Sequence, residues 1–226
     1  MDALQITYTL SAPGRRPAGL AWDGHYLWNA DFGDGRLYRL DPESGAVAAG
    51  LLCPGILSGL AWDGESLWLG VLDKRWLLTI NPRRLEVDRT LPVEEAGRVG
   101  GVAWDGNNLW VVDQQAGALL AVERESGRVV RRLVVPVAGG GLVYRDGALW
   151  LGAPQTMRFD QESGQFEWEG EQEDYALLKI DPADGVELAR FPLDFFAAGL
   201  TWAGDSLWLS SARAGALYRG SLVRSW

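Results

Sequence analysis

Acidic side chains are the groups in this sequence best suited to chemistry. Asp31 and Asp113 each stand three residues after the tryptophan of a Leu-Trp pair, and Glu95 lies in another irregular stretch. A carboxylate whose pKa is raised toward neutrality by burial can act as a general acid or base. Such oxygens can also bind calcium. Alternatively, an aspartate at this position caps the following turn by accepting backbone N–H groups. The sequence leaves all three roles open.

Other catalytic classes lack the residues that they need. His25, the only histidine, follows an Asp-Gly turn on the regular face, away from the expected pocket, and Cys53 is the only cysteine. We therefore expect no Ser-His-Asp or Cys-His machinery, and no zinc-binding spacing of Cys and His is present. We interpret His25 as part of a turn and Cys53 as a small buried residue at the end of a strand. We therefore expect no cofactor, with calcium as the alternative.

A ten-residue pattern, Gly-Leu-Ala-Trp-Asp-Gly followed by Leu-Trp, dominates the chain. It occupies residues 19–28, 59–68, 101–110, 141–150 and 199–208, with starts 40, 42, 40 and 58 residues apart. A period near 40 with several short strands per unit is typical of a β-propeller. We predict an all-β fold, a five-bladed β-propeller of four-stranded antiparallel blades, forming a single domain over residues 1–226.

The two ends of the chain are expected to share one blade. The fifth unit runs short after residue 219, whereas residues 4–10 alternate as an outer strand would. We predict that this N-terminal strand closes the ring and removes an exposed sheet edge. In the alternative, residues 222–226 form the fifth outer strand and residues 4–10 an extra one.

Repeat-locked aromatic and small residues are read as packing elements. Nine of the twelve tryptophans recur at the two fixed positions of the pattern, where flat rings can fill the space between neighbouring blades. A pair of small residues, such as Ala18-Gly19 or Ser58-Gly59, begins each inner strand. We expect the five inner strands to crowd at the axis, where only small residues fit.

Function is expected on the face where the repeats differ, which we call the irregular face. It carries the loops between strands two and three and the loops between blades. Its mixed charges and aromatic rings suit a polar small molecule or a peptide end. The candidate ligand-binding residues are Arg16, Asp31, Phe32, Asp73, Arg75, Trp76, Glu95, Arg98, Asp113, Gln114, Phe159, Phe166, Trp168, Phe196 and Arg213. The same face collects Arg15, Lys74, Glu94, Gln115, Asp194 and Phe195.

An insertion interrupts the fourth unit between its second and third strands. Met157 and Phe159 alternate with polar residues, as do Phe166 and Trp168, which predicts an inserted β-hairpin over residues 155–174 with one apolar face. Residues 157–174 carry seven acids and one arginine. The hairpin could act as a lid or partner-binding arm, or it could pack on the rim.

Charge and hydropathy limit the partners. A net charge of −9 and a pI near 4.7 disfavour nucleic acid and anionic membranes. There is no apolar run of membrane-spanning length and no basic, apolar leader. We expect a cytoplasmic protein that binds a small molecule, a peptide or a protein. A secreted protein whose leader has been removed would begin in the same way.

The repeat, with its Leu-Tyr-Arg-Leu-Asp-Pro-Glu-Ser-Gly segment at residues 37–45, resembles the five-bladed propellers of the glutamine cyclotransferase (glutaminyl cyclase) family. It is also similar to YncE-like and streptogramin-lyase-like propellers. The resemblance covers residues 4–226 and implies conversion of N-terminal glutamine to pyroglutamate, with loss of ammonia, by a carboxylate in a central pocket.

Two family motifs differ in this chain. The family's Phe-Thr-Gln-Gly-Leu opening is replaced by residues 16–20, Arg-Pro-Ala-Gly-Leu, and its Asn-Glu-Leu-Glu motif has no counterpart near Gly141 or Gly199. No catalytic residue can therefore be transferred by motif. We predict a non-catalytic propeller that binds its ligand or partner on the irregular face, with a cyclotransferase-like enzyme as the alternative.

Overall fold

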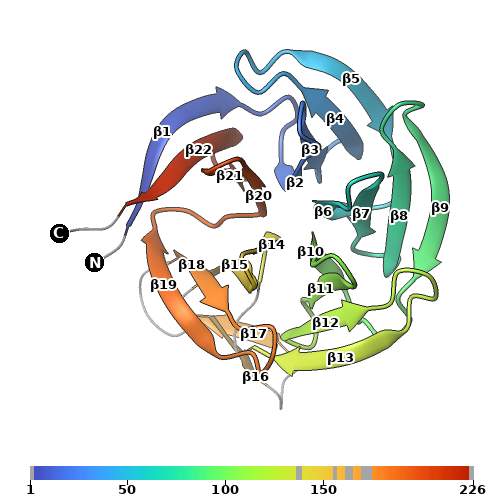
Figure 1. The fold of residues 1–226 in the computed structure, drawn as a ribbon, viewed down its shortest axis with the longest axis vertical. Coiled ribbons are helices and arrows are strands. Elements are labelled where there is room, and N and C mark those ends of the chain that lie inside the picture. Colours follow the sequence, from blue (N-terminus) through green and yellow to red (C-terminus); the bar gives the residue numbers. More distant parts are fainter. Residues whose placement is uncertain (1–2, 136–138, 155–156, 161–164, 169–174, 224–226) are drawn as a thin grey trace.

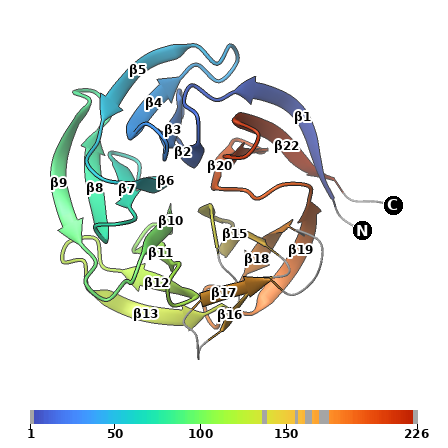
Figure 2. The same cartoon turned by 180° about the vertical axis from the view of Figure 1, so that it is seen from behind.

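The computed structural model describes residues 3–135, 139–154, 157–160, 165–168 and 175–223. These residues form strands and loops and contain no helix. Five four-stranded antiparallel sheets surround a common axis (Figure 1). The predicted five-bladed β-propeller is confirmed, and the view from behind shows the same ring of blades (Figure 2). No described helix is long and apolar enough to cross a membrane.

Each blade runs from an inner strand at the axis to an outer strand. Blade one contains β2 (Pro17–Trp22), β3 (Leu27–Asp31), β4 (Arg36–Leu40) and β5 (Val47–Leu52). Blade two contains β6 (Leu57–Trp62), β7 (Leu67–Val71), β8 (Trp76–Asn81) and β9 (Glu86–Pro92). Blade three contains β10 (Val99–Trp104), β11 (Leu109–Asp113), β12 (Ala118–Val122) and β13 (Val129–Val134).

Blades four and five follow the same order. Blade four contains β14 (Leu142–Arg145), β15 (Ala148–Pro154), β18 (Tyr175–Ile180) and β19 (Glu187–Leu193). Blade five contains β20 (Gly199–Ala203), β21 (Ser206–Ser211), β22 (Ala216–Val223) and, as its outer strand, β1 (Ala3–Ser11).

The N-terminal strand closes the ring, as predicted. β1 pairs antiparallel with β22 from Ala3 opposite Val223 to Ser11 opposite Ala216. The alternative, with a separate outer strand over residues 222–226, is wrong, because residues 222 and 223 continue β22. Residues 224–226 lie outside the described residues. The first and last strands of the chain thus share one sheet, and β1 covers the edge that β22 would otherwise expose.

The inner strands pack closely against one another around the axis. A Cβ atom added to Gly19 would lie 2.5 Å from the backbone nitrogen of Leu60 in the next blade. One added to Gly59 would lie 2.3 Å from that of Val102, and the glycines at 101, 141 and 199 show similar contacts with the next inner strand. The expected crowding is confirmed. We call this ring of five glycines the waist.

The second-strand tryptophans pack as expected. Trp28, Trp68 and Trp110 are buried, and each indole Nε1–H donates to the aspartate of its own Asp-Gly turn at 2.7 Å. In blade four Arg145 occupies that aspartate position, and the buried Nε1 of Trp150 has no partner among the described residues. Trp28, Trp68 and Trp110 each belong to a buried cluster shared with the next blade, so these rings fill the space between neighbouring blades.

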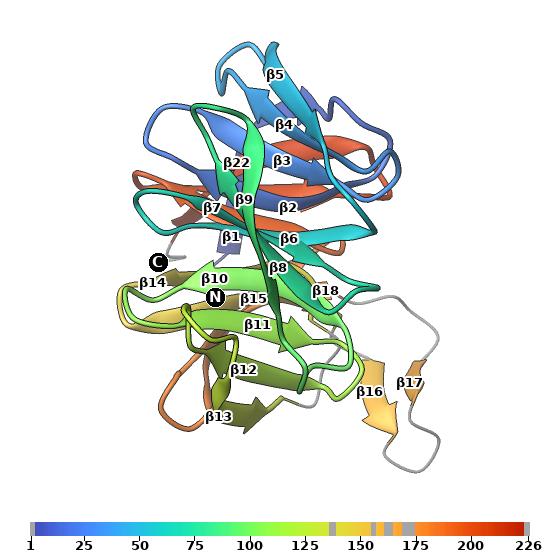
Figure 3. The ribbon, with the colours of Figure 1, turned by 90° about the vertical axis from the view of Figure 1, so that its right-hand side faces the viewer.

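Two short strands leave blade four between β15 and β18. β16 (Met157–Asp160) pairs with β17 (Gln165–Trp168), with Met157 opposite Trp168 and Phe159 opposite Phe166. Figure 3 shows this pair standing apart from the ring of blades. Residues 155–156, 161–164 and 169–174 of the predicted hairpin lie outside the described residues.

Candidate functional site

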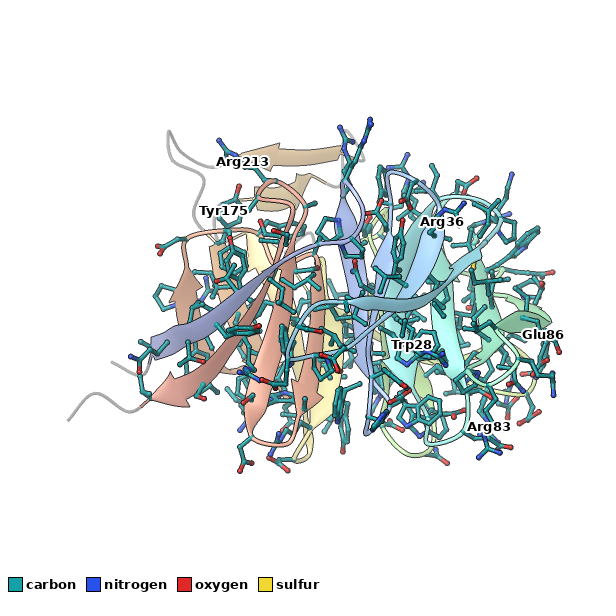
Figure 4. The ribbon with its side chains drawn as sticks, turned by 90° about the horizontal axis from the view of Figure 1, so that it is seen from above. Trp28, Arg36, Arg83, Glu86, Tyr175 and Arg213 are labelled. Carbon is teal, nitrogen blue, oxygen red and sulfur yellow. The ribbon has the colours of Figure 1, made fainter. Side chains whose placement is uncertain are left out.

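A cavity of about 570 Å³ opens on the irregular face at the axis. Figure 4 shows Arg213 and Tyr175 at this face and Arg83 toward the opposite one. We call the cavity the mouth. Its volume falls in the range of small-molecule sites, which is about 300–1,000 Å³.

The floor of the mouth is made of one small residue from each blade. These residues directly precede the waist glycines and are Ala18, Ser58, Gly100, Gly140 and Ala198. Because no large side chain rises from the floor, the cavity reaches down to the closely packed backbones of the waist. The Ser58 hydroxyl is held away from the cavity because it donates a hydrogen bond to the carbonyl of Val99 at 2.7 Å.

The wall of the mouth also follows the repeat. The residue just after each second strand supplies a wall side chain in four blades: Phe32, Leu72, Gln114 and Ala212. Phe32 is 41% exposed although it is a large apolar residue, as expected for a ring that faces an open cavity. The Gln114 side chain donates to the carbonyl of Gly139 at 3.0 Å and lies over Gly100.

Three arginines complete the lining of the mouth: Arg15, Arg16 and Arg213. All three are exposed. Among the described residues that line the mouth there is no aspartate or glutamate. No described acid forms an ion pair with Arg15 or Arg16. The described lining of the mouth therefore carries three basic side chains and no acidic one, in a protein whose net charge is −9.

A carboxylate in the loop of blade one holds the arginine segment in place. Asp31 is completely buried. One of its oxygens accepts the backbone N–H of Arg16 at 2.8 Å, and the other accepts those of Gly33 at 2.7 Å and Asp34 at 3.0 Å. The backbone N–H of Phe32 donates to the carbonyl of Arg16 at 2.9 Å. Both backbone groups of Arg16 are thereby bonded to one loop.

Two other blades repeat this arrangement, which we call the carboxylate clasp. In blade two Asp73 accepts the N–H of Ile56 at 2.8 Å, while Leu72 donates to the Ile56 carbonyl at 2.8 Å. In blade three Asp113 accepts the N–H of Arg98 at 3.2 Å, while Gln114 donates to the Arg98 carbonyl at 3.1 Å. The clasp fixes each inter-blade loop against the wall residue.

The carboxylates of the clasps are occupied by backbone donors rather than pointed into the mouth. Asp113, only 1% exposed, also accepts the N–H groups of Gly97, Gln115 and Ala116. In Asp73 the N–H of Ile56, helped by nearby Lys74, lowers the pKa of the carboxyl group against the opposing effect of burial. The turn-capping role foreseen for Asp31 and Asp113 matches these contacts.

The remaining predicted residues divide into two groups. Phe196 lines the mouth together with Arg16, Phe32, Gln114 and Arg213. Outside the lining, Arg75 donates to the carbonyl of Glu94, Trp76 packs on the buried cluster between blades one and two, and the Glu95 carbonyl accepts from Arg132. The side chains of Phe159, Phe166 and Trp168 lie outside the described residues.

Sequence reasoning left out several lining residues, chiefly Ser58, Leu72, Ala198 and Ala212. A signal for them exists, because each occupies the same position of the repeat as another lining residue. For metal binding, no group of three or more His, Cys, Asp or Glu side chains gathers within the described part of the chain. The predicted absence of a cofactor stays a prediction.

Comparison with known proteins supports the architecture. No family model and no curated protein matches the sequence. By structure, the chain is similar to glutaminyl cyclase from Myxococcus xanthus, with a TM-score of 0.79 and 16% identity over 99% of this chain and 98% of that one. It is also similar to a chain in the mitotic checkpoint complex, with a TM-score of 0.59 and 15% identity over 97% and 92% of the two chains. The expected resemblance to the glutaminyl cyclase propeller is confirmed for the fold, and at these identities the likeness shows the fold alone.

Proposed function

We propose that this propeller binds a small anionic molecule, bearing a carboxylate or a phosphate, in the mouth without chemically changing it. The observation that carries the proposal is the convergence of Arg15, Arg16 and Arg213 on a cavity with no acid among its described lining residues. Basic side chains gathered in a concave site raise the local concentration of anions.

The residue type supports recognition of an oxyanion in particular. A guanidinium group presents a planar set of N–H donors that matches the two oxygens of a carboxylate or phosphate. The clasp gives Arg16 a fixed backbone, since its N–H and carbonyl are both bonded to the Asp31 loop. A site whose backbone is already ordered loses less conformational entropy when the ligand binds.

The size of the mouth favours a small molecule over a folded protein. A cavity of about 570 Å³ can enclose most of the surface of a metabolite-sized ligand. The apolar wall residues Phe32 and Leu72 add contact area beside the arginines. A protein partner would have to present a single acidic side chain or chain end to use the same features.

A glutaminyl-peptide cyclotransferase-like activity is the second candidate, and the structural likeness to glutaminyl cyclase favours it. Its chemistry would require a carboxylate near the bound glutamine. The sequence candidates for that role are Asp31, Asp113 and Glu95. The described lining of the mouth lacks all three, and the two aspartates already accept several backbone N–H groups. These contacts support the binding proposal over the enzymatic one.

Titration calorimetry with inorganic phosphate and with acetate tests the proposal. We expect saturable binding that weakens as sodium chloride is raised, because the attraction is electrostatic. Replacing both Arg15 and Arg16 with glutamine should lower the phosphate affinity at least about tenfold, the effect of losing charged hydrogen bonds. Arg83→Gln is the matched control, since Arg83 is exposed toward the opposite face (Figure 4).

Two results would reject the proposal. Equal phosphate affinity in the wild type and the double variant would place binding elsewhere. Incubation with a glutamine-initiated peptide provides the other arm, because a product lighter by one ammonia would show that the protein is a cyclotransferase.

A further inference from the structure

A second cavity adjoins the mouth on the irregular face, between blades four and five. It has a volume of about 690 Å³, and Phe196, Ala212 and Arg213 line both cavities. Two of these residues, Ala212 and Arg213, place the junction at the loop after β21. We call this second space the side cavity.

Where the two cavities meet, the wall of the mouth is formed by a small side chain. The wall position holds Phe32, Leu72 and Gln114 in the first three blades but Ala212 in blade five. A single methyl group covers much less space than a phenyl, isobutyl or carboxamide side chain. The side cavity therefore meets the mouth at the one described wall position where the repeat carries a very small residue.

Aromatic rings dominate the side cavity. The connection from blade four to blade five supplies two of them. The ring centroid of Phe195 lies 4.6 Å from that of Tyr218 in blade five, and the ring centroid of Phe196 lies 6.1 Å from that of Tyr175 in blade four. Ile6 adds a further apolar side chain from β1. Such a lining fits a flat apolar group.

Phe196 connects the two spaces directly. A Cβ atom added to Gly140 in the mouth floor would lie 2.5 Å from Cζ of Phe196, so the ring extends over the floor of the mouth. The same ring also pairs with Tyr175, which lines the side cavity. A ligand that touches this ring can therefore occupy both cavities at once.

The charges of the two cavities differ and give a bound ligand a direction. Arg15 and Arg16 line only the mouth, Asp194 lines only the side cavity, and Arg213 lines both. The described mouth lining thus has three basic side chains and no acid, whereas the side cavity has one of each, so an anionic group is attracted more strongly to the mouth. The anionic end of a ligand is therefore favoured in the mouth, and its uncharged part in the side cavity.

We propose that the ligand is an oxyanion joined to a flat, apolar, preferably aromatic body, with the anion held by the arginines of the mouth and the body inserted among Phe195, Phe196, Tyr175 and Tyr218. This inference rests on the proposed function and narrows its ligand class. It predicts that an oxyanion with an aromatic body binds more tightly than the same oxyanion alone. The arginines by themselves would not produce this preference, because their attraction depends on the charge of the ligand and not on its apolar body.

Calorimetric titrations with inorganic phosphate, phenyl phosphate and 2-naphthyl phosphate test this inference. Burial of one or two rings should raise affinity at least about tenfold from phosphate to 2-naphthyl phosphate. If phosphate binds and the aryl phosphates bind no more tightly, the inference fails while the proposed function stands. If no member of the series binds, both fail.

A variant that fills the side cavity distinguishes specific binding in that cavity from nonspecific hydrophobic binding elsewhere on the surface. Ala214 is exposed and lines the side cavity without lining the mouth. Ala214→Trp should reduce the ratio of 2-naphthyl phosphate affinity to phosphate affinity about tenfold. Ala46→Trp, at another exposed alanine in the turn that precedes β5, should keep the wild-type ratio. An unchanged ratio in the Ala214 variant, with a wild-type melting temperature, would overturn the inference.

Discussion

The carboxylate of Asp31 accepts the backbone N–H of Arg16 at 2.8 Å, so a buried acid positions a basic residue of the mouth. The return bond, from the N–H of Phe32 to the Arg16 carbonyl, ties a wall residue to the same segment. The chain thus uses acidic residues, which looked catalytic in the sequence, to hold arginines and wall residues in place. The acids of the clasps bind backbone N–H groups, and the described lining of the mouth carries arginines and no acid.

Asp31→Asn should destabilise the fold without any change in side-chain size. Both carboxylate oxygens accept backbone N–H groups, and an amide would turn an NH₂ group toward one set of donors. We expect the free energy of unfolding to fall by about 2 to 3 kcal/mol, as measured by denaturant titration. Glu65→Gln, at an exposed residue, should stay within about 0.5 kcal/mol of the wild type. Wild-type stability in the Asp31 variant would refute the clasp.

Gly59→Ala should be strongly destabilising because of the waist. The added methyl group would lie 2.3 Å from the backbone nitrogen of Val102 and 2.6 Å from the carbonyl oxygen of Gly100, and neither backbone can move without shifting a blade. We expect a loss of about 3 kcal/mol in unfolding free energy.

Gly50→Ala is the matched control for the waist. Its added methyl group would have no neighbour closer than 3.6 Å, so stability should stay the same or rise by about 0.5 kcal/mol. Comparable unfolding midpoints for the two variants would mean that the inner strands are farther apart than described.

Asp73 should contribute a pH-dependent part of the stability. The N–H of Ile56 lowers the pKa of its carboxyl group in the folded state. The ionised form is therefore favoured by folding, and its contribution is complete above the ordinary aspartate pKa of about 3.9. It is lost as the pH falls through the lower folded-state pKa.

The difference in unfolding free energy between the wild type and Asp73→Asn isolates this contribution. The difference should be present at neutral pH and should shrink as the pH falls below the ordinary aspartate value. A difference that does not vary with pH would show that the Ile56 bond does not depend on the charge.

Cys53 should be unreactive in the folded protein. It is 5% exposed, and burial raises the pKa of its thiol to about 11, which leaves little thiolate near neutral pH. A chromogenic disulfide reagent at pH 8 should label it only after denaturant is added. Rapid labelling of the native protein would contradict the described packing at the end of β5.

The sequence was sufficient to predict the blades because the repeat constrains them. The glycine and tryptophan positions represented by Gly59 and Trp68 recur where the waist and the core require them. The sequence repeat therefore reflects the packing of the blades. The closing strand was predictable as well, since the fifth unit lacked an outer strand and residues 4–10 supplied one.

The site was harder to predict because its residues differ from blade to blade. Asp73 closes the clasp of blade two from a position two residues later than Asp31 and Asp113 do in theirs, so spacing alone did not group the three. Ala212 has no chemical group that marks it as a site residue in the sequence, although its small size leaves the mouth open to the side cavity. The electrostatics of the mouth depend on which acids are turned away from it, and only the three-dimensional contacts show this.

Crystals grown with tungstate, an electron-dense oxyanion, show directly whether the mouth holds an anion. We expect an anomalous-scattering peak in the mouth among Arg15, Arg16 and Arg213, and loss of that peak when Arg15 and Arg16 are replaced with glutamine. An empty mouth in wild-type crystals, with tungstate bound elsewhere on the protein, would mean that the mouth is not an oxyanion site.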